Sequence, residues 1–125
     1  MLRIVYMGTP DFAVPALEAL AARHNVVGVV TNPDRKSGRG KKVTPPPVKV
    51  AAERAEIPVY QPKSLKEEGA YEKIAAWEPD FIVVAAYGQI LGQQFLDLPK
   101  HDCINIHASL LPKYRGAAPI NWAIV

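Results

Sequence analysis

The chain has 125 residues, of which 49% are apolar and 22% charged, and its formal net charge is +3. This composition is typical of a globular domain and excludes a disordered chain or a fibrous repeat. The sequence has no apolar run of the roughly 20 residues that cross a bilayer, no signal-peptide pattern, and a single cysteine, which cannot form an internal disulfide. We therefore expect a cytoplasmic protein with no metal, no membrane contact and no obligate protein partner.

Short runs rich in Val and Ile alternate with helix-like segments along the chain. Runs that are apolar on both faces are typical of strands in a parallel sheet covered by helices on both sides. The predicted strands are 3–7, 25–30, 58–60, 80–86 and 103–107. The predicted helices are 11–23, regular only in its later turns because of Pro15, then 47–56, 66–77, 93–98 and a last one from residue 117 to the chain end.

This alternation predicts an α/β fold with a doubly wound, mostly parallel, Rossmann-like sheet and right-handed crossovers. The last predicted helix has no glycine stop, so we expect the chain to end before its domain does. In such sheets the reactive groups lie beyond the carboxyl ends of the strands. The segments expected to hold a site are therefore 8–12, 31–46, 86–92 and 107–116.

The positive charge is concentrated in one segment. Residues 34–42 hold five basic side chains and one acid, a local net charge of +4, which leaves about −1 for the rest of the chain. Such a run is compatible with a solvated loop, and equally with an arm that contacts a phosphate backbone and whose glycines allow close approach. Three prolines, 45–47, would form a stiff return to the domain.

The turn after the first strand, 8–12, contains one glycine. It therefore lacks the G-x-G-x-x-G dinucleotide fingerprint, and no acid ends the second strand at 31–33, so a nicotinamide enzyme is disfavoured. The segment is compatible with a plain strand-to-helix turn. It is also compatible with a helix N-terminus that offers amides to an anionic or carbonyl group.

Asn105 and His107 are two residues apart near the end of a predicted strand, which places them on the same face. An amide donor beside an imidazole can polarise a carbonyl and move a proton, as acyl transfer to an amine requires. Both could instead satisfy loop backbone groups, and no second ligand stands at metal-binding spacing. Two apolar loops, 87–92 and 109–116, would suit a pocket for a ring system.

Four segments, in order and across essentially the whole chain, resemble methionyl-tRNA formyltransferases: 7–15, 32–49, 85–91 and 104–112. The resemblance implies transfer of a formyl group from 10-formyltetrahydrofolate to the α-amine of methionyl initiator tRNA, for translation initiation. It also implies that residues 1–125 are the N-terminal part of the formyltransferase catalytic domain. A C-terminal β-barrel domain of the family is absent from this sequence.

The same resemblance implies roles for individual residues. The catalytic roles fall on Asn105 and His107, whereas the family's catalytic acid lies on a later segment that this sequence does not contain, so we expect the chain alone to be weak or inactive. The residues implied in folate binding are Ser109, Leu110, Leu111, Pro112, Gly88, Gln89, Ile90 and Leu91. The residues implied in substrate or tRNA binding are Gly8, Thr9, Pro10, Phe12, Arg35, Lys36, Arg39, Lys41 and Lys42.

Two alternatives remain open at this point. A formyltransferase that acts on an amino sugar nucleotide shares the Asn-x-His and Ser-Leu-Leu-Pro motifs, but lacks the Gly-Thr-Pro-Asp-Phe turn and the long basic insertion. A non-catalytic RNA-binding fragment would use residues 34–42 and leave Asn105 and His107 without a role. Salt-dependent RNA binding without folate binding would favour the fragment.

Overall fold

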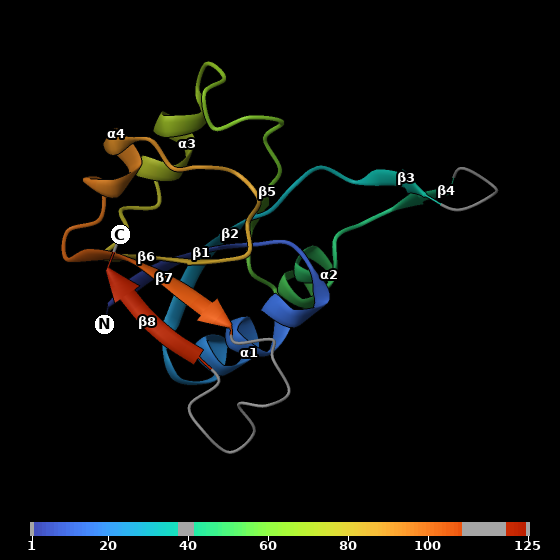
Figure 1. Cartoon of the computed structure of the whole chain (residues 1–125), viewed down its shortest axis with the longest axis horizontal. Helices are drawn as coiled ribbons and strands as arrows, with labels where there is room; N and C mark the ends of the chain where they lie inside the picture. The colour runs from blue at the N-terminus through green and yellow to red at the C-terminus, as the bar shows by residue number, and fades with distance from the viewer. Residues whose placement is uncertain (1, 38–41, 109–119, 125) are drawn as a thin grey trace.

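The computed structural model describes residues 2–37, 42–108 and 120–124 (Figure 1). Its main feature is a six-stranded sheet with the order β5–β2–β1–β6–β7–β8. The first five of these strands are parallel, and β8 runs antiparallel to β7. The predicted α/β fold with a mostly parallel sheet is therefore confirmed. The bounds are β1 (Arg3–Gly8), β2 (Asn25–Val30), β5 (Val59–Tyr60), β6 (Phe81–Ala85), β7 (Asp102–Ala108) and β8 (Ile120–Ile124).

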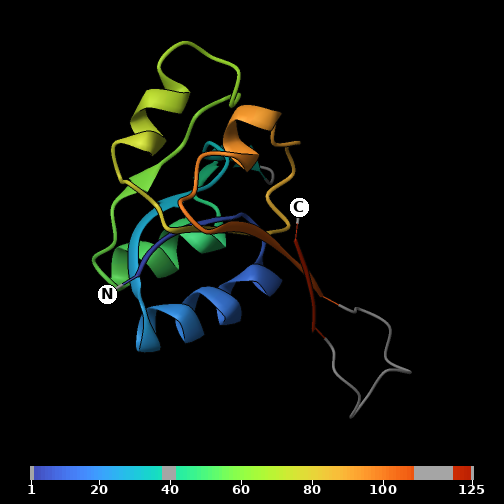
Figure 2. The ribbon, with the colours of Figure 1, turned by 90° about the vertical axis from the view of Figure 1, so that its left-hand side faces the viewer.

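Helices cover both faces of this sheet (Figure 2). The helices are η1 (Asp11–Ala13), α1 (Val14–Arg23), α2 (Pro47–Arg54), α3 (Ala70–Ala75) and α4 (Gln93–Leu96). Side chains of α1 and α2 pack in one core cluster with Tyr6, whereas those of α3 and α4 pack in a second cluster with Val5. Neighbouring residues of β1 thus serve opposite faces, as the two-residue period of a strand requires.

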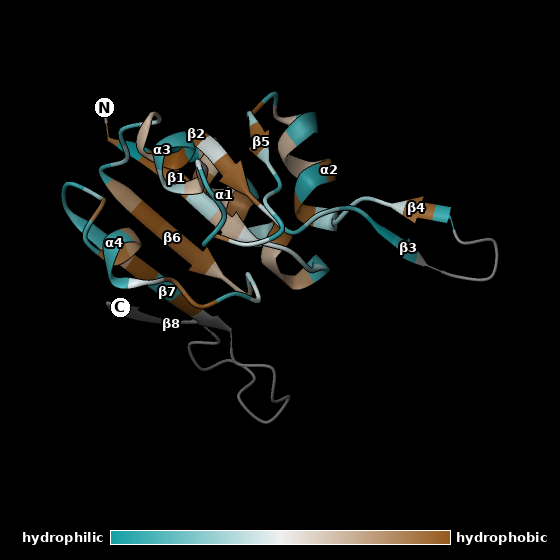
Figure 3. Ribbon diagram, turned by 90° about the horizontal axis from the view of Figure 1, so that it is seen from above, coloured by the Kyte–Doolittle hydropathy of each residue, from teal (hydrophilic) through white to brown (hydrophobic). Residues whose placement is uncertain are grey.

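The buried strands are apolar along their length, which Figure 3 shows as brown ribbon through β1, β2 and β6. Val5, Tyr6 and Met7 are fully buried in β1, and Ile82 is fully buried in β6. This is the pattern expected for a sheet covered on both sides. Cys103 is also buried, and desolvation by its apolar surroundings raises the pKa of its thiol to about 11.

The sequence located most elements, but the predicted helix from residue 117 to the chain end is wrong. Ile120–Ile124 form β8, paired with β7 in register Ile104↔Ile124 and Ala108↔Ile120. The segment alternates Ile, Trp and Ile with Asn and Ala, which suits a strand. Pairing with the edge of β7 satisfies backbone groups that a helix would leave open on the sheet. Residues 117–119 lie outside the described part of the chain.

The predicted helix 66–77 is shorter in the structure, where α3 spans only Ala70–Ala75. Gly69 stands immediately before it with φ +88°, a left-handed conformation that breaks a continuous helix. Upstream, the backbone N–H groups of Lys63 and Ser64 donate to the Glu67 carboxylate instead of entering a helix. The first predicted helix behaves as expected, since Pro15 lies at the start of α1 and a 3-10 turn precedes it.

The basic segment contains two short strands where the sequence indicated a loop. β3 (Arg35–Ser37) and β4 (Lys42–Thr44) pair antiparallel, with Lys36 opposite Val43. This hairpin, which we call the arm, projects away from the sheet (Figures 1 and 3). Residues 38–41 lie outside the described part of the chain. Within the described part, no helix is both long and apolar enough to span a membrane.

Candidate active site

The strand order creates a crevice between β1 and β6. From β1 the chain first extends the sheet outward through β2 and β5, and then crosses to the other side of β1 to form β6 and β7. Connections therefore leave the carboxyl ends of β1 and β6 in opposite directions. In open α/β sheets, ligands bind in the crevice at this switch point.

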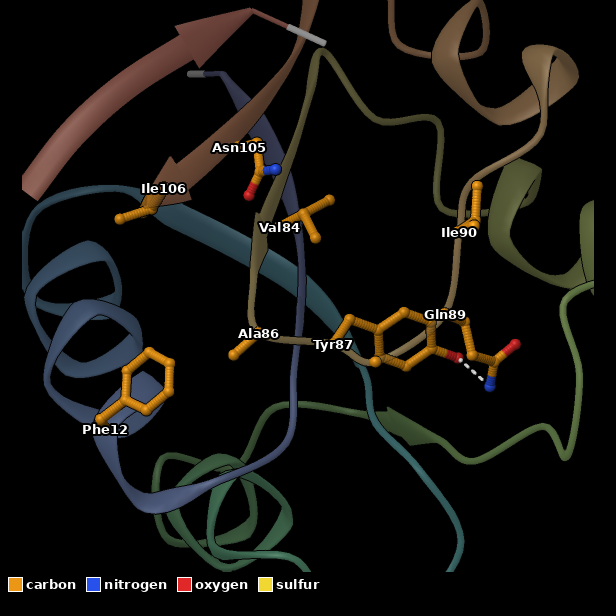
Figure 4. Close-up of a pocket in the computed structure, with 9 residues that line it drawn as sticks. Phe12, Val84, Ala86, Tyr87, Gln89, Ile90, Asn105 and Ile106 are labelled. Atoms are coloured by element: carbon orange, nitrogen blue, oxygen red, sulfur yellow. Dashed lines mark hydrogen bonds between the residues drawn. The ribbon is translucent and has the colours of Figure 1, made fainter. Parts of the chain in front are cut away.

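A pocket of about 400 Å³ lies at the carboxyl ends of β6 and β7, next to the η1 turn that follows β1 (Figure 4). One wall is the aromatic ring of Phe12 from η1, and another is the loop that follows β6. The pocket is mostly apolar, with side-chain amides contributed from two segments. Its lining residues are Phe12, Val84, Ala86, Tyr87, Gly88, Gln89, Ile90, Asn105 and Ile106.

Asn105 is the polar group that the sheet itself supplies to this pocket. It lies in β7, opposite Val84 of β6 on one side and Ala123 of β8 on the other. Strands on both sides fix its backbone, and its half-buried side chain can present an amide N–H to a carbonyl oxygen. His107 follows two residues later in the same strand, with its backbone opposite Asn121.

Ile90 gives the pocket an exposed apolar rim, because the residue is 93% exposed to solvent. Phe12, across the pocket, is 42% exposed. Large apolar side chains left open at the mouth of a pocket are typical of a site that closes over an apolar ligand. The pocket therefore combines an apolar rim with a hydrogen-bond donor held on a strand.

The loop after β6 has an unusual backbone. Ala86 has φ +54° and Gly88 has φ +93°, so left-handed residues stand on both sides of Tyr87. A residue with a Cβ, such as Ala86, costs roughly 1–2 kcal/mol in this conformation. Tyr87 is 1% exposed, and desolvation raises the pKa of its hydroxyl well above the ordinary value.

A polar network ties this loop to the carboxyl ends of β1 and β2. The Tyr87 carbonyl accepts hydrogen bonds from Asn32 Nδ2 at 2.9 Å and from the Thr9 hydroxyl at 3.2 Å. Thr9 Oγ1 in turn accepts from Asn32 Nδ2 at 3.1 Å and from the Thr31 hydroxyl at 3.4 Å. The sequence analysis placed Thr31 and Asn32 in a segment expected to hold a site, because they directly follow the second predicted strand, but it gave neither residue a role.

Gln89 uses its side chain within the same network. Its Oε1 accepts from the Leu65 backbone N–H at 3.0 Å, and its Nε2 donates to Asn32 Oδ1 at 3.1 Å. Nε2 also lies 3.3 Å from the Tyr87 hydroxyl, the contact drawn in Figure 4. The side-chain amide of Gln89 therefore stabilises the loop through these hydrogen bonds.

The predicted site residues fall into four groups, apart from His107, whose backbone lies in β7 beside Asn121. Phe12, Gly88, Gln89, Ile90 and Asn105 meet at the pocket. Leu91 instead packs against the core cluster of α3 and α4, and Pro10 precedes η1. Gly8 ends β1 and Thr9 follows it, and neither lines this pocket. Arg35 and Lys36 lie in β3 and Lys42 in β4. Ser109, Leu110, Leu111, Pro112, Arg39 and Lys41 lie outside the described part of the chain.

Gly8 has a packing role that the sequence did not show. A Cβ placed on it would lie 2.7 Å from the Ala85 carbonyl oxygen, so β1 and β6 can approach here only without a side chain. We expect Gly8→Ala to lower the free energy of unfolding by about 1–3 kcal/mol, the usual cost of overpacking. Urea denaturation of the chain measures this change in the free energy of unfolding.

The matched control is Gly92→Ser, at a glycine with no atom within 4 Å of an added Cβ. Gly92 precedes the first residue of α4, where serine is a favoured N-cap, so this variant should be neutral or slightly stabilising. Equal destabilisation by both variants would contradict the packing role of Gly8.

The root of the arm is held by a separate set of polar contacts. Asp34 accepts from Gln61 Nε2 at 2.7 Å and pairs with Lys49 Nζ at 3.2 Å, and these two contacts lower the pKa of its carboxyl group. Gln61 Nε2 also donates to the Asn32 backbone carbonyl at 3.1 Å. A second cavity, of about 310 Å³, lies at this root between Thr9, Asn32, Arg35 and the three prolines 45–47.

Metal chemistry has no visible basis in the described residues, where no three His, Cys, Asp or Glu side chains cluster at ligand distance. The described site is thus a mostly apolar pocket at the carboxyl ends of β6 and β7, with the Asn105 amide on one strand, and the arm begins beyond the carboxyl end of β2. In doubly wound α/β sheets, ligands bind beyond the carboxyl ends of the strands.

Comparison with known proteins identifies the family. The formyl transferase family matches residues 2–125, essentially the whole chain. The chain belongs to the formyl transferase family.

Curated relatives make the resemblance more specific. The chain is 58% identical, over 125 residues, to methionyl-tRNA formyltransferase of Clostridium novyi, and 56% identical over 125 residues to that of Geobacter sulfurreducens. Each match covers 99% of this chain but only 40% and 39% of the relative. The resemblance indicated by the sequence motifs is confirmed, and the chain spans about 40% of the length of the curated relatives it matches.

Solved structures confirm the fold. Glycinamide ribonucleotide transformylase 1 of Geobacillus kaustophilus superposes with a TM-score of 0.60 at 24% identity, covering 95% of this chain and 64% of that one. A formyltetrahydrofolate deformylase of Pseudomonas syringae superposes with a TM-score of 0.58 at 24% identity, covering 94% and 39%. At this level of identity the likeness concerns the fold alone.

Proposed function

We propose that this chain is the N-terminal part of the catalytic domain of an enzyme that transfers a formyl group from 10-formyltetrahydrofolate to the α-amine of methionyl initiator tRNA. The observation that carries the proposal is the 58% identity to a methionyl-tRNA formyltransferase along the entire chain. The pocket and the arm support it, because they offer separate places for a ring-bearing donor and for a polyanion.

The chemistry assigns distinct roles to the two candidate catalytic residues. The neutral α-amine attacks the formyl carbon, and the carbonyl oxygen gains negative charge in a tetrahedral intermediate. The side-chain N–H of Asn105 stabilises this oxyanion, since it comes from a strand and does not reorganise during the reaction. His107 relays the proton from the attacking nitrogen to the folate nitrogen that leaves, a transfer suited to an imidazole, which has one nitrogen that can accept a proton and one that can donate it.

The folate ring would occupy the pocket between Phe12 and Ile90, where apolar surface is open. The arm would contact the phosphates of the tRNA through Arg35, Lys36 and Lys42, all exposed. The arm begins at the carboxyl end of β2, two strands from β6, so both substrates would approach the same edge of the sheet.

The test is a formylation assay on charged initiator tRNA with 10-formyltetrahydrofolate. It uses the full-length protein, by which we mean this chain extended to the length of its curated relatives. We expect formyl-methionyl-tRNA to form, with much weaker or no turnover by residues 1–125 alone. The proposal fails if the full-length protein formylates an amino sugar nucleotide and not the tRNA. It also fails if the protein binds RNA but no reduced folate.

A further inference from the structure

We propose that Asn32 is a positioning residue for the donor pocket: it fixes the loop of Tyr87 and Gln89 in the shape that receives the folate, although it does not line that pocket itself. This inference rests on the proposed function for the identity of the ligand. Its structural half, the control of the loop by Asn32, rests on the contacts of this chain alone.

The Asn32 side chain connects the loop after β6 to the carboxyl ends of β1 and β2. Its Nδ2 donates to the Tyr87 carbonyl at 2.9 Å, and its Oδ1 accepts from Gln89 Nε2 at 3.1 Å. One amide therefore holds two residues of the loop by both of its polar ends. The same Nδ2 also donates to Thr9 Oγ1 at 3.1 Å, which anchors Asn32 to the end of β1.

The backbone conformation of the loop needs stabilising contacts from outside the loop. Ala86 and Gly88 are both left-handed, at φ +54° and +93°, and a conformation of this kind persists only when its surroundings determine it. Ile90, which follows directly, is 93% exposed, so packing of its side chain adds little to the hold. Burial of the Tyr87 side chain in the core cluster of α3 and α4 holds one side of the loop, and the hydrogen bonds from Asn32 and Thr9 to the Tyr87 carbonyl fix the backbone that leads into Gly88, Gln89 and Ile90.

Asn32 acts at a distance from the reacting atoms. The pocket that contains Asn105 is lined by residues of η1, β6, β7 and the loop, and Asn32 is not among them. Removing the Asn32 amide should therefore weaken binding of the donor without removing the oxyanion donor. This predicts a rise in KM for the folate with little change in kcat, a separation that a general loss of structure would not produce.

The experiment compares Asn32→Leu, which keeps the approximate volume and removes both polar ends, with the unaltered full-length protein. We expect the KM for 10-formyltetrahydrofolate to rise about tenfold and kcat at saturation to stay within about threefold. Asn32→Asp serves as a second variant, because it keeps the acceptor for Gln89 and loses the N–H groups that Asn32 donates to Tyr87 and Thr9. It should raise the KM by a smaller factor.

The matched control is Gln61→Met. Gln61 contacts Asn32 only through the backbone carbonyl, at 3.1 Å, and otherwise bonds to Asp34 at the arm root. The Gln61→Met variant should keep the KM for the folate within about twofold of that of the unaltered protein. An equal rise in KM for Gln61→Met and Asn32→Leu would overturn the proposal, since the effect would then belong to the arm root and not to the loop.

Amide hydrogen exchange tests the structural half without any folate. The Leu65 backbone N–H donates to Gln89 Oε1 at 3.0 Å, so its exchange rate reports whether Gln89 is in place. In Asn32→Leu we expect exchange at Leu65 to be at least tenfold faster, with the amides of β6 unchanged. Unchanged protection of Leu65 overturns the proposal. If the unaltered protein binds no reduced folate, the proposed function fails, and the Leu65 amide still decides the role of Asn32.

Discussion

Replacing Asn105 with alanine in the full-length protein is expected to lower the single-turnover rate of formyl transfer by about two or more orders of magnitude, the scale for loss of one oxyanion donor. The measurement is made at saturating folate and tRNA. Under these conditions a change in rate reports the chemical step and not binding. The affinities for both substrates should change little, because the amide N–H matters mainly when charge develops on the formyl oxygen.

A matched control lies next to Asn105 on the same strand. Ile104→Val removes one methyl group from β7 and leaves the amide in place, so its rate should stay within about threefold of the unaltered protein. A similar loss in Ile104→Val and Asn105→Ala would show that damage to the strand, not the missing amide, causes the effect.

His107→Ala is expected to cost a comparable factor, because the proton must still travel from the amine to the leaving folate nitrogen. If Asn105 and His107 act on one intermediate, the double variant should lose less than the product of the two single losses. Near-normal saturated turnover in His107→Ala would remove the imidazole from the mechanism. Asn105 and substrate positioning would then have to account for the rate.

Neutralising the arm should have the second large effect, and it should fall on tRNA alone. Replacing Arg35, Lys36 and Lys42 with glutamine removes three exposed positive charges from β3 and β4. We expect tRNA binding to weaken by on the order of 10- to 100-fold at low salt. The slope of the logarithm of tRNA affinity against the logarithm of salt concentration should become shallower by about two to three, because each phosphate contact contributes roughly 0.7–0.9 to it.

The control for the arm carries the same change in charge elsewhere. Arg23, Lys66 and Lys100 are exposed basic residues outside the arm, and their replacement by glutamine should leave the salt dependence nearly unchanged. The KM for the folate should be unaffected in both triple variants, because none of the arm residues that the structure describes lines the pocket of Asn105. If the arm variant and the control variant weakened tRNA binding equally, the arm would act only through the overall charge of the protein.

Local sequence pattern was enough to predict the sheet and most of the helices. Runs such as those of β1 and β6 are apolar on both faces, and a run of that kind is stable in water only when both faces are covered. The order of strand and helix then predicted the doubly wound fold and the strand ends at which a site is expected. Phe12 and Asn105, which were expected near those ends, both line the pocket there, because a position relative to a strand end can be read along the chain.

The end of the described chain shows the limit of local pattern. Residues 120–124 can form either a helix or a strand, and the unpaired edge of β7 decides the outcome by supplying backbone partners. The left-handed Gly69 similarly shortens α3 for a reason that helical periodicity does not contain.

The sequence by itself determined most strands of the main sheet, the strand ends where a site is expected, and the presence there of an amide and a basic segment. Only the tertiary structure decided which polar groups meet. Gly8 proved to lie where the Ala85 carbonyl of β6 leaves no room for a side chain on β1, and Asn32, Thr9 and Gln89 proved to make hydrogen bonds that hold the loop at Tyr87. These residues are distant in the chain, and hydrogen bonds between them form only after the crossover brings β6 beside β1. The physical reason is that strand propensity is a local property, whereas the partner of a side-chain hydrogen bond is set by topology and register.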